Sequence, residues 1–248
     1  MKKNHSFLWN FAYETKQFFY QLLRVDIVRQ FIAAIRYFCL VIILRRLKTL
    51  EPDTGDVGVN TVFMNLKGLK TFSYMGVNRS NLMVQPLTAI RVSRSAPVLS
   101  IGPRSEGEIL NLLGAGFRNV RGLDLMTYSP WIDLGDMHAM PYKDNAFEVT
   151  MLGWVITYSD NRKKAADEII RVTRNGGIVA VGVEYTSISG EQIEKNLGYE
   201  VCVKDRLESV QAILDLFGDH VDHIYFSHDL PKNPPKQWQL MVHFSIKK

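Results

Sequence analysis

The sequence predicts a doubly wound α/β domain preceded by a basic helical arm. From Ala96 onward, short apolar runs alternate with amphipathic segments, a pattern typical of right-handed βαβ units on a parallel sheet. The chain closes with two strand-like runs, 221–228 and 237–246, which the linker LPKNPPK joins as an antiparallel pair. Residues 1–50 differ from the rest in charge and composition. At 248 residues, the chain suffices for one large or two small domains.

The elements of the body follow from its apolar runs and end signals. Strands are predicted over 98–102, 119–124, 131–135, 147–155 and 178–185. Helices are predicted over 105–116, over 160–174 and near 205–217. Ser105 can cap the first of these helices, and Glu106 and Glu108 suit its first turn, where the helix dipole favours acidic side chains.

The positive charge of the chain lies in its N-terminal arm. Residues 1–48 hold nine Lys or Arg and two acidic residues, a net +7, whereas the whole chain carries +5. The remaining residues are therefore slightly negative. Proteins that bind nucleic acid more often carry their positive charge on the folded body, so we expect no nucleic-acid partner.

The arm is predicted to be helical, because no Gly or Pro occurs before Pro52. Its apolar stretch, 27–44, is interrupted by Arg29 and Arg36, and the longest uninterrupted run, 37–44, is short of the roughly twenty residues of a membrane span. Three alternatives stay open. The arm could lie on a membrane surface, cover an apolar face of the body or of an oligomer partner, or form a tilted span.

A polar stretch rich in Gly, Pro and Asp, 51–60, predicts a hinge, and a helix is expected within 79–93. The chain is thereby divided into an arm (1–50), a linker with a pre-domain helix (51–95) and a main domain (96–248).

Cysteine and histidine usage excludes two classes of site. The two cysteines, Cys39 and Cys202, form no disulfide framework and no zinc motif, which suggests a reducing, cytoplasmic location, peripheral at a membrane if the arm binds one. His223 and His228 would point to opposite faces of their predicted strand. We therefore expect no metal site.

Four segments of the main domain together resemble the class I S-adenosylmethionine-dependent methyltransferases of the small-molecule type. They are VLSIGPRSEGEI, VRGLDL, GDMHAMPYKDNAFEVTMLGWVITYSD and AADEIIRVTRNGGIVAVGVEY. The resemblance covers about 96–248. It implies a Rossmann-like, seven-stranded sheet in the order 3-2-1-4-5-7-6, with strand 7 antiparallel, and S-adenosylmethionine as cofactor.

Matched position by position, the resemblance implies a set of cofactor-binding residues. Gly102 and the following Pro103 turn the chain beneath the cofactor, and Asp124 accepts hydrogen bonds from the ribose hydroxyls. Leu125 lies against the adenine, while Asp136 and the Met137 backbone meet its amino group. Gly153 and Trp154 line the place where the methyl donor faces its acceptor. No catalytic residue is assigned, although His138 and Tyr158 lie near the same end of the predicted sheet.

The glycine-rich turn departs from the family pattern at three positions. The family's strand acid is Ser100 here, and its second and third glycines are Arg104 and Glu106. Arg104 could pair with the cofactor's carboxylate as a charge-assisted fork, or it could fill part of the site.

A second departure is the short connection between Asp124 and Asp136, which leaves no room for a full crossover helix. We therefore predict no helix longer than about two turns in 125–135. Met126, Tyr128 and Trp131 could cover the side of the pocket that this opens.

The resemblance implies methyl transfer to a small-molecule or lipid-linked acceptor. Two alternatives stay open: a domain that lost catalysis and binds a ligand or partner, and a same-fold enzyme that uses another anionic ligand. An oligomer through the N-terminal helices is a further alternative for the arm.

Overall fold

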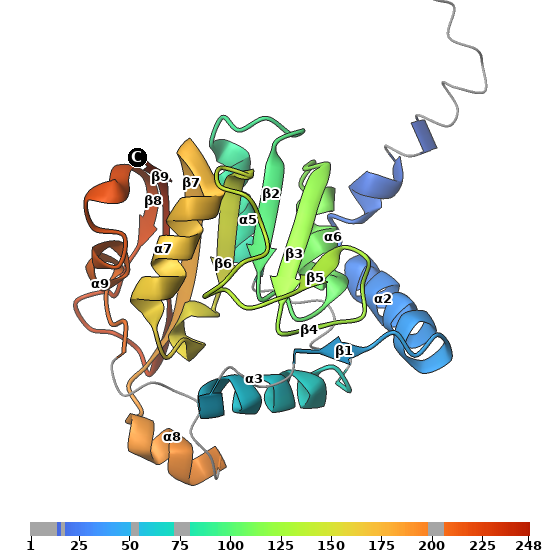
Figure 1. Cartoon of the computed structure of the whole chain (residues 1–248), viewed down its shortest axis with the longest axis horizontal. Helices are drawn as coiled ribbons and strands as arrows, with labels where there is room; N and C mark the ends of the chain where they lie inside the picture. The colour runs from blue at the N-terminus through green and yellow to red at the C-terminus, as the bar shows by residue number, and fades with distance from the viewer. Residues whose placement is uncertain (1–13, 16–17, 51–54, 72–79, 198–205) are drawn as a thin grey trace, which may run out of the picture.

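A computed structural model describes residues 14–15, 18–50, 55–71, 80–197 and 206–248 of the chain. Its main sheet has seven strands in the order β5-β3-β2-β6-β7-β9-β8 (Figure 1). The strands from β5 to β7 are parallel, and β9 is antiparallel to both of its neighbours. Renumbered along the main domain, this is the order 3-2-1-4-5-7-6 with strand 7 antiparallel, so the predicted topology is confirmed.

The strand bounds lie close to the predicted ranges. They are β2 (Pro97–Ile101), β3 (Asn119–Asp124), β5 (Ile132–Leu134), β6 (Phe147–Gly153), β7 (Thr173–Thr186), β8 (Val221–His228) and β9 (Gln237–Ile246). Only β7 is much longer than expected. It starts at Thr173 and crosses an irregularity in its pairing with β6, where Gly176 adopts a φ of +73°.

Helices cover both faces of the sheet. On one face, α7 (Arg162–Val172) and α9 (Val210–Asp215) contribute to a core with the strands, and on the other α5 (Ser80–Ala89) and α6 (Glu106–Gly114) do so. As predicted, the Ser105 side chain caps α6 by accepting the Gly107 N–H at 3.3 Å. Short elements complete the chain: η2 (Ile156–Tyr158), α8 (Gly190–Leu197) and η3 (Gly218–His220).

The N-terminal arm packs against the outside of this body. It contains α2 (Asp26–Tyr37), the π-helix η1 (Phe38–Ile43) and β1 (Lys48–Thr49). α2 lies beside α6, and β1 forms a two-stranded antiparallel ladder with β4 (Met126–Thr127). No helix among the described residues is long and apolar enough to cross a bilayer. One face of the arm thus packs on the body, as one of the three alternatives has it, and the other face is exposed.

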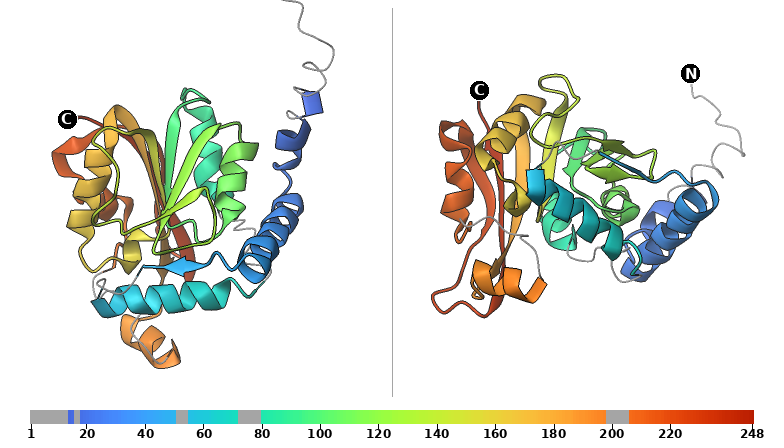
Figure 2. Two further views of the ribbon diagram at one scale, coloured as in Figure 1. Left: turned by 45° about the vertical axis from the view of Figure 1, so that its right-hand side comes forward. Right: turned by 60° about the horizontal axis from the view of Figure 1, so that its bottom comes forward.

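The hinge predicted over 51–60 is wrong from Gly55 onward, because α3 (Gly55–Gly68) begins there. Local glycines disfavour a helix, but packing of its C-terminal part, through Leu66 and the buried Leu69 just beyond it, overrides that preference. α3 runs across the carboxyl ends of the parallel strands (Figures 1 and 2). The division into an arm, a linker and a main domain stays a prediction.

Residues 125–135 contain no helix, as the spacing predicts. Met126 and Tyr128, expected to cover the open side of a pocket, are instead buried in a small core with Leu23 and Ala33 of the arm segment and Leu69. The arm therefore packs where the connection between β3 and β5 lacks a helix.

Candidate functional site

Most of the predicted site residues follow the carboxyl ends of four neighbouring strands. Gly102 follows β2, Asp124 ends β3, Asp136 comes shortly after β5, and Trp154 follows β6. In an open α/β sheet, ligands bind at this edge, near the point where the strand order reverses. β2 lies between β3 and β6 in the sheet, so the strand order reverses at β2.

The turn after β2 is tightly built. Gly102 adopts a φ of +69°, and a Cβ placed there would lie 2.1 Å from Val155 Cγ1, so only glycine fits. Its N–H donates to the Leu123 carbonyl at 2.8 Å, which ties the turn to β3. Pro103 is buried beside Gly122. Arg104 also adopts a left-handed backbone, with a φ of +56°, which is uncommon for a residue with a side chain.

Asp124 is the buried acid of the site, with an exposed fraction of 5%. Its Oδ2 accepts the Arg104 N–H at 2.8 Å, and its Oδ1 accepts the Met126 N–H at 3.3 Å. Burial raises the pKa of Asp124 to about 6, against the lowering effect of these hydrogen bonds. The carboxyl group therefore titrates near neutral pH, and it fixes the conformation of the glycine-rich turn.

The Arg104 side chain points toward the helix that crosses the strand ends. Its Nε donates to Asn65 Oδ1 of α3 at 3.0 Å. Arg104 thus joins the turn after β2 to α3, and it places a cation at the edge where the predicted ligand would lie.

Glu106, in the place of the family's third glycine, pairs with the arm. Its side chain is fully buried, and the Arg36 guanidinium of α2 binds both carboxylate oxygens, with Nη2 at 2.9 Å from Oε1. Ser129 Oγ donates to the same Oε1 at 2.5 Å. The guanidinium also stacks over Trp131, at 4.0 Å from the ring centroid. The hydrogen bond to Glu106 is the main cause of a raised pKa for Arg36.

The third departure, Ser100, also has a partner inside the body. Its hydroxyl donates to the carboxylate of Glu108 on α6, and both side chains are buried. Gly153 lies against the same carboxylate, since a Cβ placed there would be 3.2 Å from Glu108 Oε2. An acidic group is therefore retained behind the turn, but it comes from the helix rather than from the strand.

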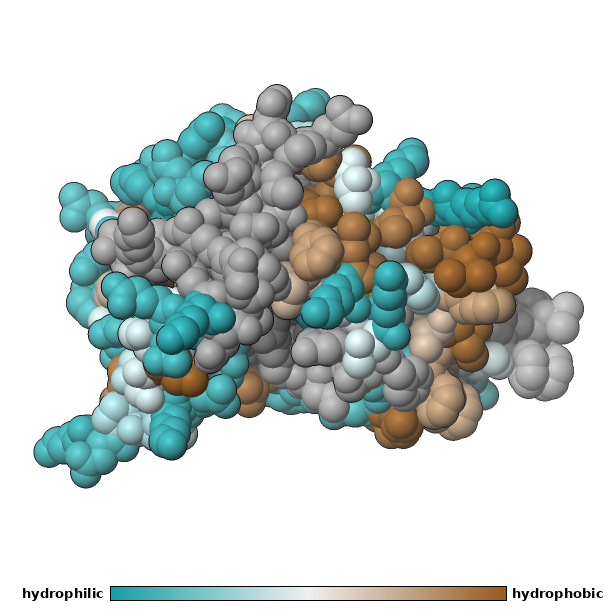
Figure 3. Space-filling view, turned by 90° about the horizontal axis from the view of Figure 1, so that it is seen from below, coloured by the Kyte–Doolittle hydropathy of each residue, from teal (hydrophilic) through white to brown (hydrophobic). Residues whose placement is uncertain are grey.

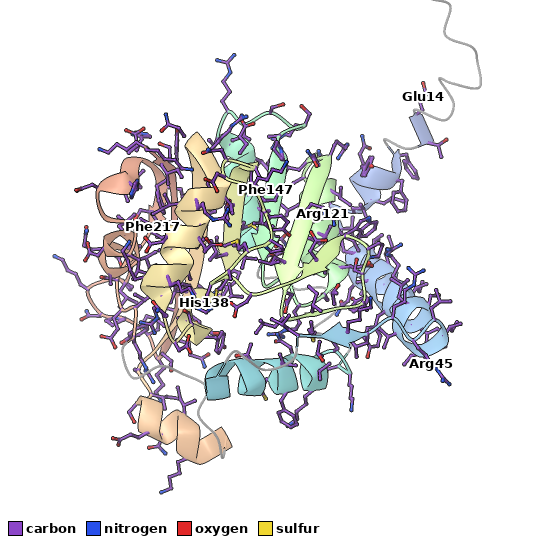
Figure 4. All side chains as sticks on the ribbon, viewed as in Figure 1. Glu14, Arg45, Arg121, His138, Phe147 and Phe217 are labelled. Carbon is purple, nitrogen blue, oxygen red and sulfur yellow. The ribbon has the colours of Figure 1, made fainter. Side chains whose placement is uncertain are left out.

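The loop after β5 is held by a chain of polar contacts. Asp136 Oδ1 lies 2.6 Å from Nδ1 of His138 and accepts the His138 backbone N–H at 2.8 Å. On the other side of the ring, Nε2 lies 2.6 Å from the hydroxyl of the buried Ser159. Burial acts to raise the pKa of Asp136, but the hydrogen bonds from His138 bring it below its ordinary value. Figure 4 shows His138 at the lower end of the sheet.

Of the remaining predicted residues, Leu125 and Met137 are half-buried and Trp154 is buried. Met137 is partly buried against the core, and the Leu125 carbonyl accepts the Leu50 N–H at 2.7 Å. Trp154 adopts a φ of +63° and is 2% exposed, and its indole N–H donates to Gln239 of β9. The side chain of Trp154 is thus part of the core, and its backbone N–H donates to the Gly182 carbonyl of β7 at 2.9 Å.

Two residues of the site, Asn65 and Arg36, were missed by sequence reasoning. Neither belongs to a recognisable motif, and their partners are 39 and 70 positions away in the chain. The available signal was the pair of charged residues, Arg104 and Glu106, in place of glycines. Among the described residues, no group of three or more His, Cys, Asp or Glu is arranged to hold a metal ion.

A comparison with models of known protein families gives one match, and it includes the turn after β2. Residues 99–181 match a family model described as a methyltransferase domain. No curated protein matches the sequence significantly.

Solved structures share the fold at low identity. One is a chain from the complex between the Haloferax volcanii Trm112 methyltransferase activator and a methyltransferase, with a TM-score of 0.55 and 15% identity over 78% of this chain and 98% of that one. Another is geranyl diphosphate C-methyltransferase from Streptomyces coelicolor in complex with Mg²⁺, geranyl diphosphate and S-adenosylhomocysteine. Its TM-score is 0.52, with 10% identity over 73% of this chain and 83% of that one. A third is the [4+2]-cyclase SpnF, with a TM-score of 0.52 and 13% identity over 88% of this chain and 95% of that one.

The strand order, the turn after β2 and the solved structures lead to one conclusion: the chain has the Rossmann-like fold of the methyltransferases, and its residues 99–181 match the methyltransferase family model.

Proposed function

We propose that this protein binds S-adenosylmethionine at the carboxyl edge of β2, β3 and β5 and transfers its methyl group to a small-molecule or lipid-linked acceptor. The observation that carries the proposal is the order of polar groups along that edge. A cation at Arg104, a buried carboxyl at Asp124 and an ionised carboxyl at Asp136 follow one another on adjacent strands. This set matches the carboxylate, ribose and adenine amino groups of the cofactor.

The residues present fit the cofactor in chemical type. Arg104 would pair with the carboxylate of the methionine part, and Asp124 would accept the ribose hydroxyls. Asp136 and the Met137 backbone would bind the adenine amino group, with Leu125 against the ring. The cofactor would supply a methyl group on a positively charged sulfur, which is a good electrophile. The protein's contribution is then positioning and the exclusion of water, because methyl transfer is an in-line displacement.

The acceptor class is supported by one fold neighbour. Geranyl diphosphate C-methyltransferase, whose name gives a small isoprenoid diphosphate, shares this fold. α3 crosses the strand ends, where an acceptor would approach the methyl donor.

A second candidate is a same-fold protein with another reaction or with none. It is favoured by Asp124, whose two carboxylate oxygens are both engaged by backbone N–H groups. It is also favoured by SpnF, a cyclase with the same fold. A lack of binding by S-adenosylhomocysteine would support this candidate over the first.

We expect the affinity for S-adenosylhomocysteine to fall about tenfold between pH 7 and pH 5. The pKa of Asp124 is about 6, so its carboxyl group is mostly ionised at pH 7 and mostly protonated at pH 5. The protonated carboxyl group is a poor acceptor of hydrogen bonds from the ribose hydroxyls. Asp136 stays ionised at both pH values because its pKa is lowered. Isothermal titration calorimetry at both pH values measures the change.

Asp124→Asn is the control for this titration, because an amide does not titrate. The variant should bind more weakly at pH 7 and should lose most of the pH dependence. The proposed cofactor is wrong if the wild-type protein binds S-adenosylhomocysteine at neither pH. The proposed role of Asp124 is wrong if the variant keeps the tenfold change.

A further inference from the structure

The helix α2 and the π-helix η1 carry an apolar stripe on the side that faces away from the body. Five large apolar residues recur at intervals of three or four positions, and each is between 51% and 61% exposed. They are Ile27, Phe31, Ile35, Phe38 and Ile42. Residues with this spacing share one face of a helix. A surface helix normally turns such a face toward the core.

The face of α2 that meets the protein is mixed, because two arginines lie on it together with the fully buried Ala33. Arg29 is 1% exposed, and its Nη1 donates to the Leu23 carbonyl at 2.7 Å, while Nη2 donates to Asn81 at 3.2 Å and pairs with Asp26. Arg36, on the same side, binds the buried Glu106. α2 therefore turns Arg29, Arg36 and Ala33 toward the body, whereas the large apolar side chains of the stripe face solvent.

The stripe continues past both ends of α2 into a larger surface. Phe18, Phe19, Leu22 and Val25 precede it, and Ile43 and Leu44 follow it, all of them exposed. In Figure 3, hydrophobic residues gather at the right-hand end of the molecule, where the arm lies in Figure 1. An apolar surface of this extent normally marks a site of contact with another molecule or with a membrane.

Basic residues flank the stripe. Arg45, Arg46 and Lys48 follow it and are exposed, and Figure 4 shows Arg45 at the outer end of the arm. Arg24, also exposed, precedes it. In the described part of the arm, the only acidic residues are Glu14 and Asp26, and Asp26 is paired with Arg29. The partner of this surface should therefore be apolar in its interior and negatively charged at its edge.

We propose that the outward stripe of α2 and η1 docks on the surface of an anionic lipid bilayer. An apolar helix face with basic flanks binds at the headgroup boundary, where anionic lipids attract Lys and Arg. Residues 26–43 are too few and too polar to span, so the helices would lie in the plane of the interface.

A second copy of the chain fits the same surface less well. If two chains paired their stripes in parallel, Arg45 and Arg46 of one chain would lie against the same two residues of the other. Antiparallel pairing would bring them near Arg24 of the other chain. Asp26, the acidic residue next to the stripe, is already paired with Arg29 of its own chain. This docking does not depend on the proposed cofactor, so the two proposals fail separately.

Co-sedimentation of the full chain with lipid vesicles tests the docking. Vesicles of phosphatidylcholine in which about 30% of the lipid is phosphatidylglycerol should bind the protein at least tenfold more strongly than vesicles of pure phosphatidylcholine. Salt at about 0.5 M should weaken the binding because it screens the charges. Replacing Arg45 and Arg46 with glutamine should weaken binding roughly 25-fold, at about fivefold per charge.

The apolar part of the contact is tested with matched double substitutions. Ile27→Glu with Ile35→Glu should reduce vesicle binding at least tenfold. Ile224→Glu with Tyr225→Glu, on exposed residues of β8, should change it less than twofold. Circular dichroism and the melting temperature check that both variants fold.

Three results would overturn the lipid proposal. The first is a wild-type protein that does not sediment with anionic vesicles. The second is equal binding by the stripe variant and the wild type. The third is a dimer in analytical ultracentrifugation that the stripe substitutions dissociate while vesicle binding is absent, which would assign the surface to a second copy.

Discussion

Replacing Arg36 with methionine is expected to lower the free energy of unfolding by about 3 kcal/mol. The substitution keeps an apolar stem on Trp131 but leaves the fully buried carboxylate of Glu106 without its cation. Removing one partner of a buried ion pair costs about 3–5 kcal/mol, and partial exposure of the Arg36 side chain favours the lower end. In a chain of this size, such a loss lowers the melting temperature by roughly 6–12 °C.

Urea denaturation of four proteins measures the effect. They are the wild type, Arg36→Met, Glu106→Gln and the double variant, which form a double-mutant cycle. The free energy of unfolding of the double variant should fall by less than the sum of the two single losses, because a neutral glutamine at position 106 no longer needs a cation. Arg45→Met, on the exposed end of the same arm, should change stability by less than about 0.5 kcal/mol. A loss that small for Arg36→Met would show that the pair does not hold the arm.

Local sequence pattern was sufficient for the strands and for the edge at which the predicted site residues lie, whereas the strand order followed from the family resemblance. Buried strands such as 147–153 are short apolar runs bounded by turn residues, and this is a property of neighbouring positions. The strand ends then place Gly102, Asp124 and Asp136 on one edge, because parallel strands end together. The short connection after Asp124 likewise excluded a helix by length alone.

Local pattern could not reveal how the N-terminal segment binds to this edge. α3 contains glycines that disfavour a helix, and its Asn65 meets Arg104 only through the tertiary fold. α2 buries Arg29 and leaves the five large apolar residues of the stripe exposed, the reverse of what periodicity alone suggests. The two charged residues in the glycine-rich turn were recognised as unusual. Their partners lie far along the chain, and no local rule relates such positions.

The substitution Arg104→Gly is expected to weaken the binding of S-adenosylhomocysteine by about 10- to 150-fold. That range corresponds to about 1.5–3 kcal/mol, the contribution of a hydrogen bond to a charged group. Glycine adopts the observed φ of +56° without strain, so the turn and its hydrogen bond to Asp124 should be retained. A loss of affinity is then due to the missing guanidinium and not to a distorted backbone.

Titration calorimetry on two further variants separates the roles of the side chain. Arg104→Lys keeps the charge but loses the planar fork, so its affinity should lie between those of the wild type and the glycine variant. Asn65→Ala removes the 3.0 Å contact that holds the guanidinium on α3 but keeps the charge, so it should weaken binding by less than Arg104→Gly does. Tighter binding by Arg104→Gly would instead show that the arginine fills the cofactor's place. Equal affinity in the glycine variant and the wild type would show that the guanidinium does not face the ligand, and that Arg104 serves only to hold α3 over the strand ends.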